Sequence, residues 1–551
     1  MSTGAHGEAD AIAPTTFSPL KNQTFRSIWL STQVSSIGWM MHTVAIGWLM
    51  ATISPSDLMV ALVQASSTLP AFILSVFAGA IADSFSRRGV LLVGRSLIAL
   101  ASAILTGLLA LGIVDPWIIL GVGFLIGCGF ALSDPAWQAS VGDIVDRRDL
   151  PAAVTLINIG FNTVRSVGPA LGGIVVASFG PLTTLVLSTL SYVVPLGTIW
   201  HSNWTVRSSP LPRERMITAI YDGARFTAIS SEIKAAIARG ALFGFSGIAI
   251  LALLPLVVRD HLNAGPFDYG VLMAGFGIGA LFGGVNAARF RRLMSQERLV
   301  MLACLACAAC AFFVAVASSV AVAATALALG GTGWVTAWSG LGISVQLASP
   351  RWIVGRTVSI YYAVTYGGIA AGSWVWGAAA EHYSLTSALV GSAGALVLVA
   401  ATGLLLPVLE NKESDHVALE GFEAPVVAVE LRPRSGPIIV KIEYQIPDEN
   451  TNAYLSLMHE RRLAQSRVGA RHWTVERDLQ EPCQWTESFR TPTWTDYLRL
   501  NHRLTAADKE LDERLQELHS GEHPPRKKLS IERPAGHPRK ADHISPFIAR
   551  I

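Results

Sequence analysis

The sequence predicts an all-α membrane protein with twelve transmembrane helices in two six-helix halves, followed by a small C-terminal α+β domain of ferredoxin-like order. Three observations carry this prediction: composition, the placement of basic residues, and a change of character after residue 409. Of the 551 residues, 51% are hydrophobic and only 15% are charged, whereas a soluble chain carries about 25% charged residues. The mean hydropathy is +0.44, and the charge deficit lies between residues 25 and 410.

Twelve apolar runs have the length of a membrane span, which is about 20 residues. Short polar breaks separate them. In the first half they cover residues 26–52, 58–82, 89–112, 116–141, 151–178 and 181–201. In the second half they cover residues 236–258, 267–289, 298–318, 320–347, 355–380 and 384–408.

Basic residues alternate between the two ends of these spans. Arg88 follows the second run and Arg148 the fourth, whereas Asp57 and Asp115 follow odd-numbered runs. Cytoplasmic loops carry the excess of Lys and Arg in membrane proteins. We therefore expect a multi-pass protein of the cell inner (plasma) membrane with both termini in the cytoplasm.

The two halves also repeat. An offset of 204 positions (283 − 79) maps Gly79 onto Gly283 and Arg87 onto Arg291, and it maps Gly168 onto Gly372. Parallel repeats of this kind build transporters in which one half rocks against the other.

The expected domains follow from these runs and from the polar segments between them. They are a cytoplasmic tail (1–24), the first six-helix half (25–203), a cytoplasmic linker (204–235), the second half (236–409), a second linker (410–435), a soluble α+β domain (436–535) and a tail (536–551). Within the soluble domain, strands are predicted at 437–446, 471–479, 484–490 and 526–534, with helices at 449–465 and within 493–519. The order β-α-β-β-α-β is ferredoxin-like.

Two motifs carry a resemblance to a known family. The stretch "GAIADSFSRRG" resembles the loop between helices two and three of the major facilitator superfamily, with Gly79, Asp83, Arg87 and Arg88 at the matching positions. It departs from that pattern where serines replace a basic residue and a glycine. The stretch "GPALGG" resembles the helix-five motif of exporters in this superfamily; its matching residues are Gly168, Pro169, Gly172 and Gly173.

The region from residue 135 to 173 and the C-terminal extension are similar to the enterobactin-exporter-like branch, the transmembrane secretion effectors. This resemblance implies proton-coupled efflux of a small amphipathic molecule, such as a siderophore, secondary metabolite or drug, with a small-molecule substrate and a proton as partners in the lipid bilayer. The tail resembles the antibiotic-biosynthesis-monooxygenase type of domain, for which a regulatory or dimerising role, with self-association, is the expectation. Two alternatives stay open: an uptake permease of the same fold, and a membrane-tethered monooxygenase-like enzyme.

The charged loop has two readings on chemical grounds alone. Asp83 can pair with arginines of the same loop or of a neighbouring helix, and a pair near the interface that forms in one conformation is a candidate latch for the outward-facing state. In the other reading, Arg87 and Arg88 follow the positive-inside rule and Asp83 caps a helix. The resemblance favours the latch.

Polar residues inside the spans are the candidates for substrate binding or proton coupling, because an ionisable group at a helix centre costs about 2.5–3.5 kcal/mol. Arg165 is the least expected; it either anchors a substrate carboxylate or phenolate, takes part in proton coupling, or pairs structurally with Asp134. Asn158 and Asn162 share its helix face. Asp134 is a candidate protonatable carboxylate, and His42 either carries a proton or packs in the core.

Other signals do not support further chemistry. Cys304, Cys307 and Cys310 lie within one apolar run, where a metal cluster would lack a fourth ligand. The glycine-rich runs lack the lysine of a phosphate-binding loop, and no basic stripe with interleaved aromatic residues indicates nucleic acid. We therefore expect no metal, no cofactor and no nucleic-acid partner, and we expect that the chain is not an enzyme.

Overall fold

The computed structural model describes residues 17–146, 148–202, 204, 216–350, 353–407, 425 and 427–533. Within these, the side chains at 76, 78–80, 82–84, 158, 162, 166 and 216–219 lie outside the description. The chain forms two compact units. One comprises Met1–Ile220, Ala235–Val345 and Val358–Glu410, and the other comprises Tyr221–Lys234, Gln346–Thr357 and Asn411–Ile551.

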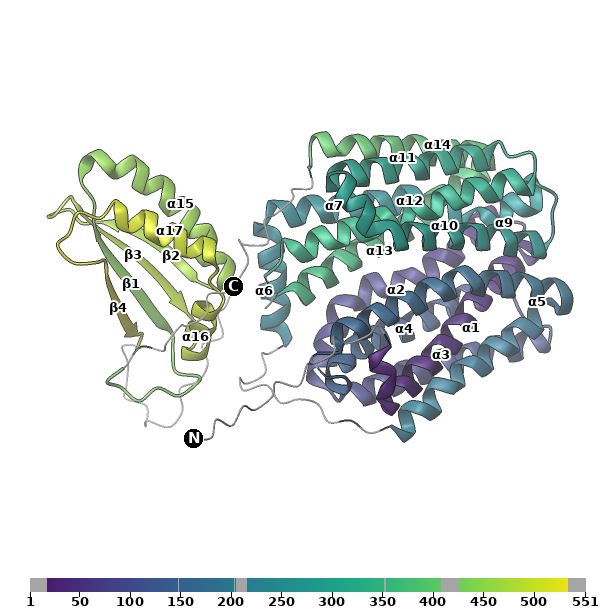
Figure 1. Cartoon of the computed structure of the whole chain (residues 1–551), viewed down its shortest axis with the longest axis horizontal. Coiled ribbons are helices and arrows are strands. Elements are labelled where there is room, and N and C mark those ends of the chain that lie inside the picture. Colours follow the sequence, from purple (N-terminus) through teal and green to yellow (C-terminus); the bar gives the residue numbers. More distant parts are fainter. Residues whose placement is uncertain are drawn as a thin grey trace, which may run out of the picture. The chain divides into compact units, whose positions relative to one another are not determined.

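The first half of the membrane unit consists of long helices that are joined by short segments of chain (Figure 1). They are η1 (Ser18–Lys21), α1 (Gln23–Ile53), α2 (Asp57–Ser84), α3 (Arg87–Ala110), α4 (Pro116–Ile144) and α5 (Leu150–His201). Two predicted spans correspond to α5. Gly180 divides it with a φ of +83°, a conformation that glycine adopts without steric penalty, and Pro181 follows.

A helix that was not predicted, α6 (Met216–Ile229), lies inside the predicted linker and precedes the second half. The next predicted span is built from four consecutive pieces: α7 (Ser231–Gly247), α8 (Ala249–Ala252), α9 (Leu254–Leu256) and the π-helical turn η2 (Val257–His261). The remaining elements are α10 (Pro266–Leu293), α11 (Gln296–Ala315), α12 (Val320–Leu347), α13 (Val354–His382), α14 (Leu385–Ala401) and η3 (Thr402–Leu404).

The described helices agree with the predicted number of spans. Ten helices in the described part of the chain are long and apolar enough to cross a membrane. That number counts α5 once and does not include α13, which has 29 residues. Dividing α5 at Gly180 and adding α13 gives the twelve predicted segments.

Polar side chains in the short breaks set where the helices begin. Ser56, Ser86 and Ser295 each accept a hydrogen bond from a backbone N–H in the first turn of the helix that follows. Asp115 does the same for α4, whose first residue is a proline. Such caps satisfy N–H groups that the helix leaves without a partner, which explains why these four breaks end on a short polar residue.

Close helix contacts at glycine confirm the repeat between the halves. A Cβ on Gly168 of α5 would lie 2.5 Å from the Met40 side chain of α1, and a Cβ on Gly372 of α13 would lie 2.2 Å from the Phe245 carbonyl of α7. Helices one and five of the first half therefore meet as helices seven and eleven do in the second half. Small residues allow this approach where lipid provides no hydrophobic driving force.

The C-terminal domain has the predicted ferredoxin-like order. Its strands are β1 (Ile438–Gln445), β2 (Arg471–Arg477), β3 (Gln484–Thr491) and β4 (Arg526–Ile531), and its helices are α15 (Thr451–Val468), α16 (Trp494–His502) and α17 (Ala506–Glu517). A short 3₁₀ turn, η5 (Asp448–Asn450), precedes α15. The sheet order is β2-β3-β1-β4, with antiparallel pairs such as Val440 with Phe489 and Val440 with Leu529.

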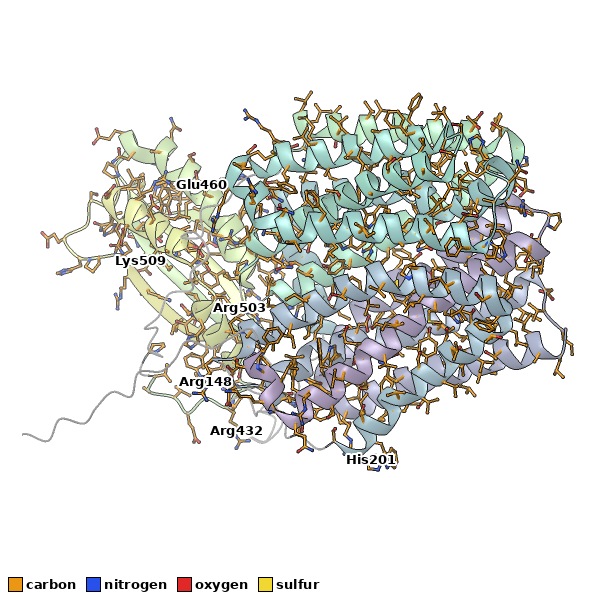
Figure 2. The ribbon with its side chains drawn as sticks, turned by 45° about the vertical axis from the view of Figure 1, so that its right-hand side comes forward. Arg148, His201, Arg432, Glu460, Arg503 and Lys509 are labelled. Carbon is orange, nitrogen blue, oxygen red and sulfur yellow. The ribbon has the colours of Figure 1, made fainter. Side chains whose placement is uncertain are left out.

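One helix was predicted where α16 and α17 lie. Thr505 divides it, because its hydroxyl and backbone N–H both donate to the Asp508 carboxylate and start a new helix. Helices α15 and α17 cover one face of the sheet (Figure 1), and their apolar residues, such as Tyr454 and Leu515, pack on β1 and β3. The surface residues Glu460 and Lys509 of these helices are exposed (Figure 2).

Candidate functional site

A buried arginine and an exposed aspartate form an ion pair inside the first half. Arg95 of α3 is 5% exposed, its Nη2 lies 3.6 Å from Oδ1 of Asp134 of α4, and the Asp134 side chain is 54% exposed. The guanidinium also lies over the Phe130 ring, 5.5 Å from its centroid. A structural pair of Arg165 with Asp134 was one of the alternatives for these residues. The structure pairs Asp134 with Arg95 instead, a residue within an apolar run that was not among the candidates.

Arg165 of α5 faces the second half. Its guanidinium lies 5.5 Å from the centroid of the Phe276 ring of α10, and Tyr366 of α13 is within electrostatic range. Among the side chains that the structure describes, no carboxylate forms an ion pair with Arg165. Tyr366 is also within electrostatic range of Asp134, so these charges of the first half and this tyrosine of the second half belong to one site.

Aromatic residues surround that site on the side of the second half, and the sequence analysis missed them. Trp338 of α12 stacks on Tyr362 of α13, with ring centroids 5.9 Å apart and planes at 27°, and its ring lies 5.6 Å from that of Tyr366. Spacing i, i+4 in "YYAVTY" places Tyr362 and Tyr366 on one helix face, a signal that was present in the sequence.

The other polar candidates within the spans are placed as follows. Asn158 and Asn162 lie on α5, and their side chains are outside the described set. His42 of α1 is 2% exposed, its ring lies 6.2 Å from that of Tyr192, and neither ring nitrogen has a hydrogen-bond partner among the described residues. The roles of all three stay predictions.

The charged loop between α2 and α3 is anchored within the first half. Arg87 donates through Nη1 to Asp143 Oδ2 at 2.6 Å and to the Ala139 carbonyl at 2.8 Å. Arg88 donates to the carbonyls of Ile199 and Trp200 at the end of α5. The carboxylate that meets Arg87 is therefore Asp143 of α4, which the sequence analysis did not consider.

The remaining motif residues lie in two helices. Gly79 and Asp83 belong to α2, and their side chains are outside the description, so the latch stays a prediction. In α5, Pro169 is buried and the motif glycines are contact points: a Cβ on Gly172 would lie 2.9 Å from Met41 Cα, and one on Gly173 would lie 2.4 Å from Gly270 Cα of α10.

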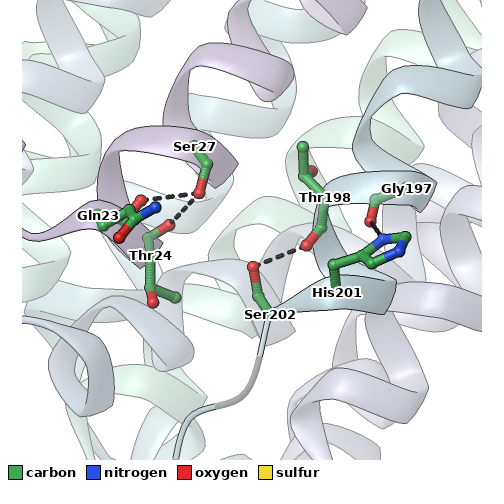
Figure 3. Close-up of a pocket in the computed structure, with 7 residues that line it drawn as sticks. All are labelled: Gln23, Thr24, Ser27, Gly197, Thr198, His201 and Ser202. Atoms are coloured by element: carbon green, nitrogen blue, oxygen red, sulfur yellow. Dashed lines mark hydrogen bonds between the residues drawn. The ribbon is translucent and has the colours of Figure 1, made fainter.

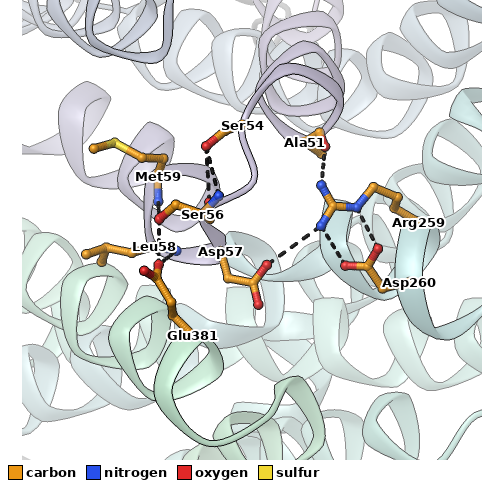
Figure 4. Close-up of polar contacts among 9 residues, drawn as sticks. All are labelled: Ala51, Ser54, Ser56, Asp57, Leu58, Met59, Arg259, Asp260 and Glu381. Atoms are coloured by element: carbon orange, nitrogen blue, oxygen red, sulfur yellow. Dashed lines mark hydrogen bonds and ion pairs between the residues drawn. The ribbon is translucent and has the colours of Figure 1, made fainter.

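At the opposite end of the helices, polar contacts join the two halves (Figure 4). Arg259 of η2 donates through Nη1 to the Ala51 carbonyl of α1, and its Nη2 lies 3.7 Å from Asp57 Oδ1 of α2. Glu381 of α13 accepts from the Ser56 hydroxyl at 2.5 Å and from the Leu58 N–H at 2.9 Å. Two segments of the second half thus hold the turn between α1 and α2.

A separate pocket of about 470 Å³ lies where α1 begins and α5 ends (Figure 3). Its lining is polar and includes Thr198, His201 and Ser202. These groups already have partners in the protein: Ser202 donates to the Thr198 carbonyl, His201 Nδ1 contacts the Gly197 carbonyl, and the Thr198 hydroxyl bonds to Ser31 of α1. The pocket therefore offers few free polar groups to a ligand.

In the C-terminal domain, the polar centre is a closed network rather than an open site. Glu487 of β3 is fully buried and accepts from Arg461 Nε and Trp473 Nε1, both at 2.8 Å. Trp485 is part of the core and Trp494 stacks on Tyr497 at 5.2 Å. Among the described residues, no group of three His, Cys, Asp or Glu side chains could hold a metal ion.

Comparisons with known proteins agree with this architecture. The family model described as transmembrane secretion effector matches residues 14–535. The multidrug efflux pump Tap of Mycolicibacterium fortuitum is 22% identical over 370 residues, which are 65% of this chain and 89% of that protein. The staphyloferrin A transporter of Staphylococcus aureus is 24% identical over 225 residues, 40% of this chain and 56% of that protein, so the chain spans little more than half the length of this relative.

Solved structures show the same fold in the membrane unit. The nucleoside transporter NupG aligns with a TM-score of 0.59 at 12% identity, over 70% of this chain and 100% of that chain. A POT family transporter aligns with a TM-score of 0.57 at 14% identity, over 71% and 97% of the two chains. The chain belongs to the transmembrane secretion effector family, within the major facilitator superfamily of multi-pass membrane transporters.

Proposed function

We propose that this protein is a secondary active transporter that exports a small amphipathic molecule in exchange for protons by alternating access. The observation that carries the proposal is the site at which Arg165 and the Arg95–Asp134 pair meet Tyr366, because ionisable groups within membrane spans mark substrate and proton pathways. A relative named as a multidrug efflux pump supports export, and a relative named as a staphyloferrin A transporter supports transport of a small molecule. The arginine pattern supports a cytoplasmic location of both termini.

Asp134 is the proposed coupling residue. Its side chain is accessible, and among the described residues its carboxylate forms an ion pair with Arg95 at 3.6 Å. A proton can therefore reach the carboxylate, neutralise it and weaken the pair. Arg165 is the proposed anchor of the substrate. Asn158, Asn162 and His42 stay candidates for the same pathway, and the proposal includes no enzymatic activity and no cofactor.

The test is transport in inverted membrane vesicles with a panel of anionic, neutral and cationic amphipathic dyes. A proton gradient should drive accumulation of at least one dye. Asp134→Asn should abolish accumulation driven by the gradient but retain exchange of dye across the membrane, whereas Asp115→Asn, at a helix cap of the same α4, should behave as wild type. Accumulation only in right-side-out vesicles would instead establish the uptake permease, and turnover of a quinol by the full chain would establish the enzyme.

The role of the C-terminal domain in this proposal is regulatory or dimerising. The sheet face that α15 and α17 leave uncovered carries polar residues, such as Lys441 and Glu443 of β1 and Arg490 of β3. Self-association through this domain would therefore use polar contacts. Light scattering of the purified full chain before and after Arg490→Glu tests it.

A further inference from the structure

Aromatic residues of α12 and α13 pack together and form an aromatic wall, one part of which is buried. Trp334 stacks on Trp338, with centroids 6.2 Å apart and planes at 12°, and it is 5% exposed. Trp338, Tyr362 and Tyr366 are each only partly buried. The part of this aromatic wall formed by Trp338, Tyr362 and Tyr366 therefore presents ring surface that the protein itself does not cover.

Opposite charges of the first half lie next to this wall, but they are not equally compensated. Asp134 has Arg95 as its partner at 3.6 Å. Arg165 contacts a ring face and a phenol, and no described carboxylate neutralises it. A guanidinium is always charged, so the site has a cation, Arg165, for which none of the described side chains provides an anionic partner.

We propose that this site binds a planar aromatic anion, that is, an aromatic carboxylate or phenolate. The anionic group contacts Arg165, which can bind it through two parallel N–H donors, and the ring stacks on the aromatic wall. An aliphatic anion satisfies Arg165 but gains no stacking, and an aromatic cation stacks but is repelled by Arg165. This inference rests on the proposed function, because it names the substrate class for the same site.

The experiment is equilibrium binding to the purified full chain in nanodiscs with three probes that differ in aromatic character or charge. They are 1-naphthoate, cyclohexanecarboxylate (no aromatic ring) and 1-naphthylmethylammonium (opposite charge). We expect wild type to bind 1-naphthoate at least tenfold more tightly than either of the other two. Trp338→Leu and Arg165→Gln should each weaken 1-naphthoate binding about tenfold, while Trp338→Phe, which keeps a ring, should retain most of it.

The matched control is Trp374→Leu, which removes a tryptophan of α13 that is 58% exposed and should leave binding unchanged. Equal affinity of wild type for 1-naphthoate and cyclohexanecarboxylate would overturn the proposal, and so would unchanged 1-naphthoate binding in both Arg165→Gln and Trp338→Leu. Dye transport by the same purified protein in proteoliposomes separates the two proposals. Gradient-driven transport without 1-naphthoate binding refutes the substrate class alone. Absence of any gradient-driven transport, with 1-naphthoate bound as expected, refutes the proposed function alone.

Discussion

The polar contacts at the turn between α1 and α2 should hold the two halves together at that end. Alternating access requires the halves to separate there in part of the cycle, so these contacts must break. The double variant Arg259→Gln and Glu381→Met removes both segments' contacts with the turn (Figure 4). A shorter neutral side chain replaces the guanidinium, and methionine has no oxygen to accept from the Ser56 hydroxyl and the Leu58 N–H. The double variant should shift the conformational equilibrium toward the form that is open at this end.

The size of the shift follows from the exposure of the partners. Arg259 and Asp57 are 29% and 26% exposed, so their pair contributes about 0.5–1 kcal/mol. The hydrogen bond from the Arg259 guanidinium to the Ala51 carbonyl adds about 0.5 kcal/mol, reduced from the usual range by solvent. Glu381 is exposed, and its two hydrogen bonds together add about 0.5 kcal/mol. The total of about 1.5–2 kcal/mol corresponds to a change of about 10–30-fold in the ratio of the two forms.

Spin labels at two exposed positions of the same end measure this ratio. Ile113, between α3 and α4, and Phe267, at the start of α10, are 58% and 51% exposed and belong to different halves. With Cys128 and Cys483 replaced by serine, electron–electron distances between labels at these positions should lengthen in the double variant. High salt should lengthen them in wild type too, because it screens exposed pairs.

The control is Arg291→Gln, at the exposed far end of α10, which should leave the distances unchanged. An unchanged distance distribution in the double variant would refute the reasoning, and so would an equal shift in the control.

Three further outcomes are expected. Glu487→Gln should destabilise the C-terminal domain by about 3 kcal/mol, because it leaves a buried guanidinium poorly paired. Glu443→Gln, at a more exposed pair on β1, should cost less than about 1 kcal/mol. Hydrogen exchange of the strands measures both free-energy changes. Gly372→Leu should disrupt the helix packing, since its Cβ would lie 2.2 Å from a carbonyl of α7. Gly107→Ala, whose Cβ would have nothing within 4 Å, should be tolerated. Size-exclusion chromatography should give a single symmetric peak for the second variant and not for the first. Burial raises the pKa of Asp512 above its ordinary value despite a neighbouring arginine. Its contribution to stability is therefore present at low pH and is lost as the pH rises through that pKa. Asp512→Asn should flatten the profile of unfolding temperature at pH values just above the ordinary carboxyl pKa of about 4.

The sequence allowed the fold to be predicted because each helix and strand has a local cause. Runs of about 20 apolar residues need no tertiary information to be identified as spans, and the strands of the C-terminal domain lie within a few residues of their predicted bounds. The division of the helix at 493–519 was missed although its cause is local too: the Thr505–Asp508 capping box. Helix α6 was missed because its segment was read as a linker by its charges.

The site was predicted less completely because pairing is a property of the packed structure. Arg165 was singled out from its position in a span, but nothing in the sequence shows that Asp134 meets Arg95 and not Arg165. Likewise, Asp143 and Arg87 are 56 residues apart in sequence. The contacts of Arg259 and Glu381 join segments even further apart, and both residues looked like ordinary polar residues at the ends of spans.

The two ends of the membrane unit differ in a way that gives Asp83 its place in the cycle. At the loop between α2 and α3, the described contacts of Arg87 with α4 and of Arg88 with α5 join helices of the first half, while at the turn between α1 and α2 the described contacts join the two halves. The described conformation is therefore held shut at the turn, and a latch at the loop would act in the opposite conformation. Asp83→Asn should then shorten the Ile113–Phe267 distance distribution, opposite in sign to the double variant at the turn; a lengthened distribution would contradict a latch at Asp83.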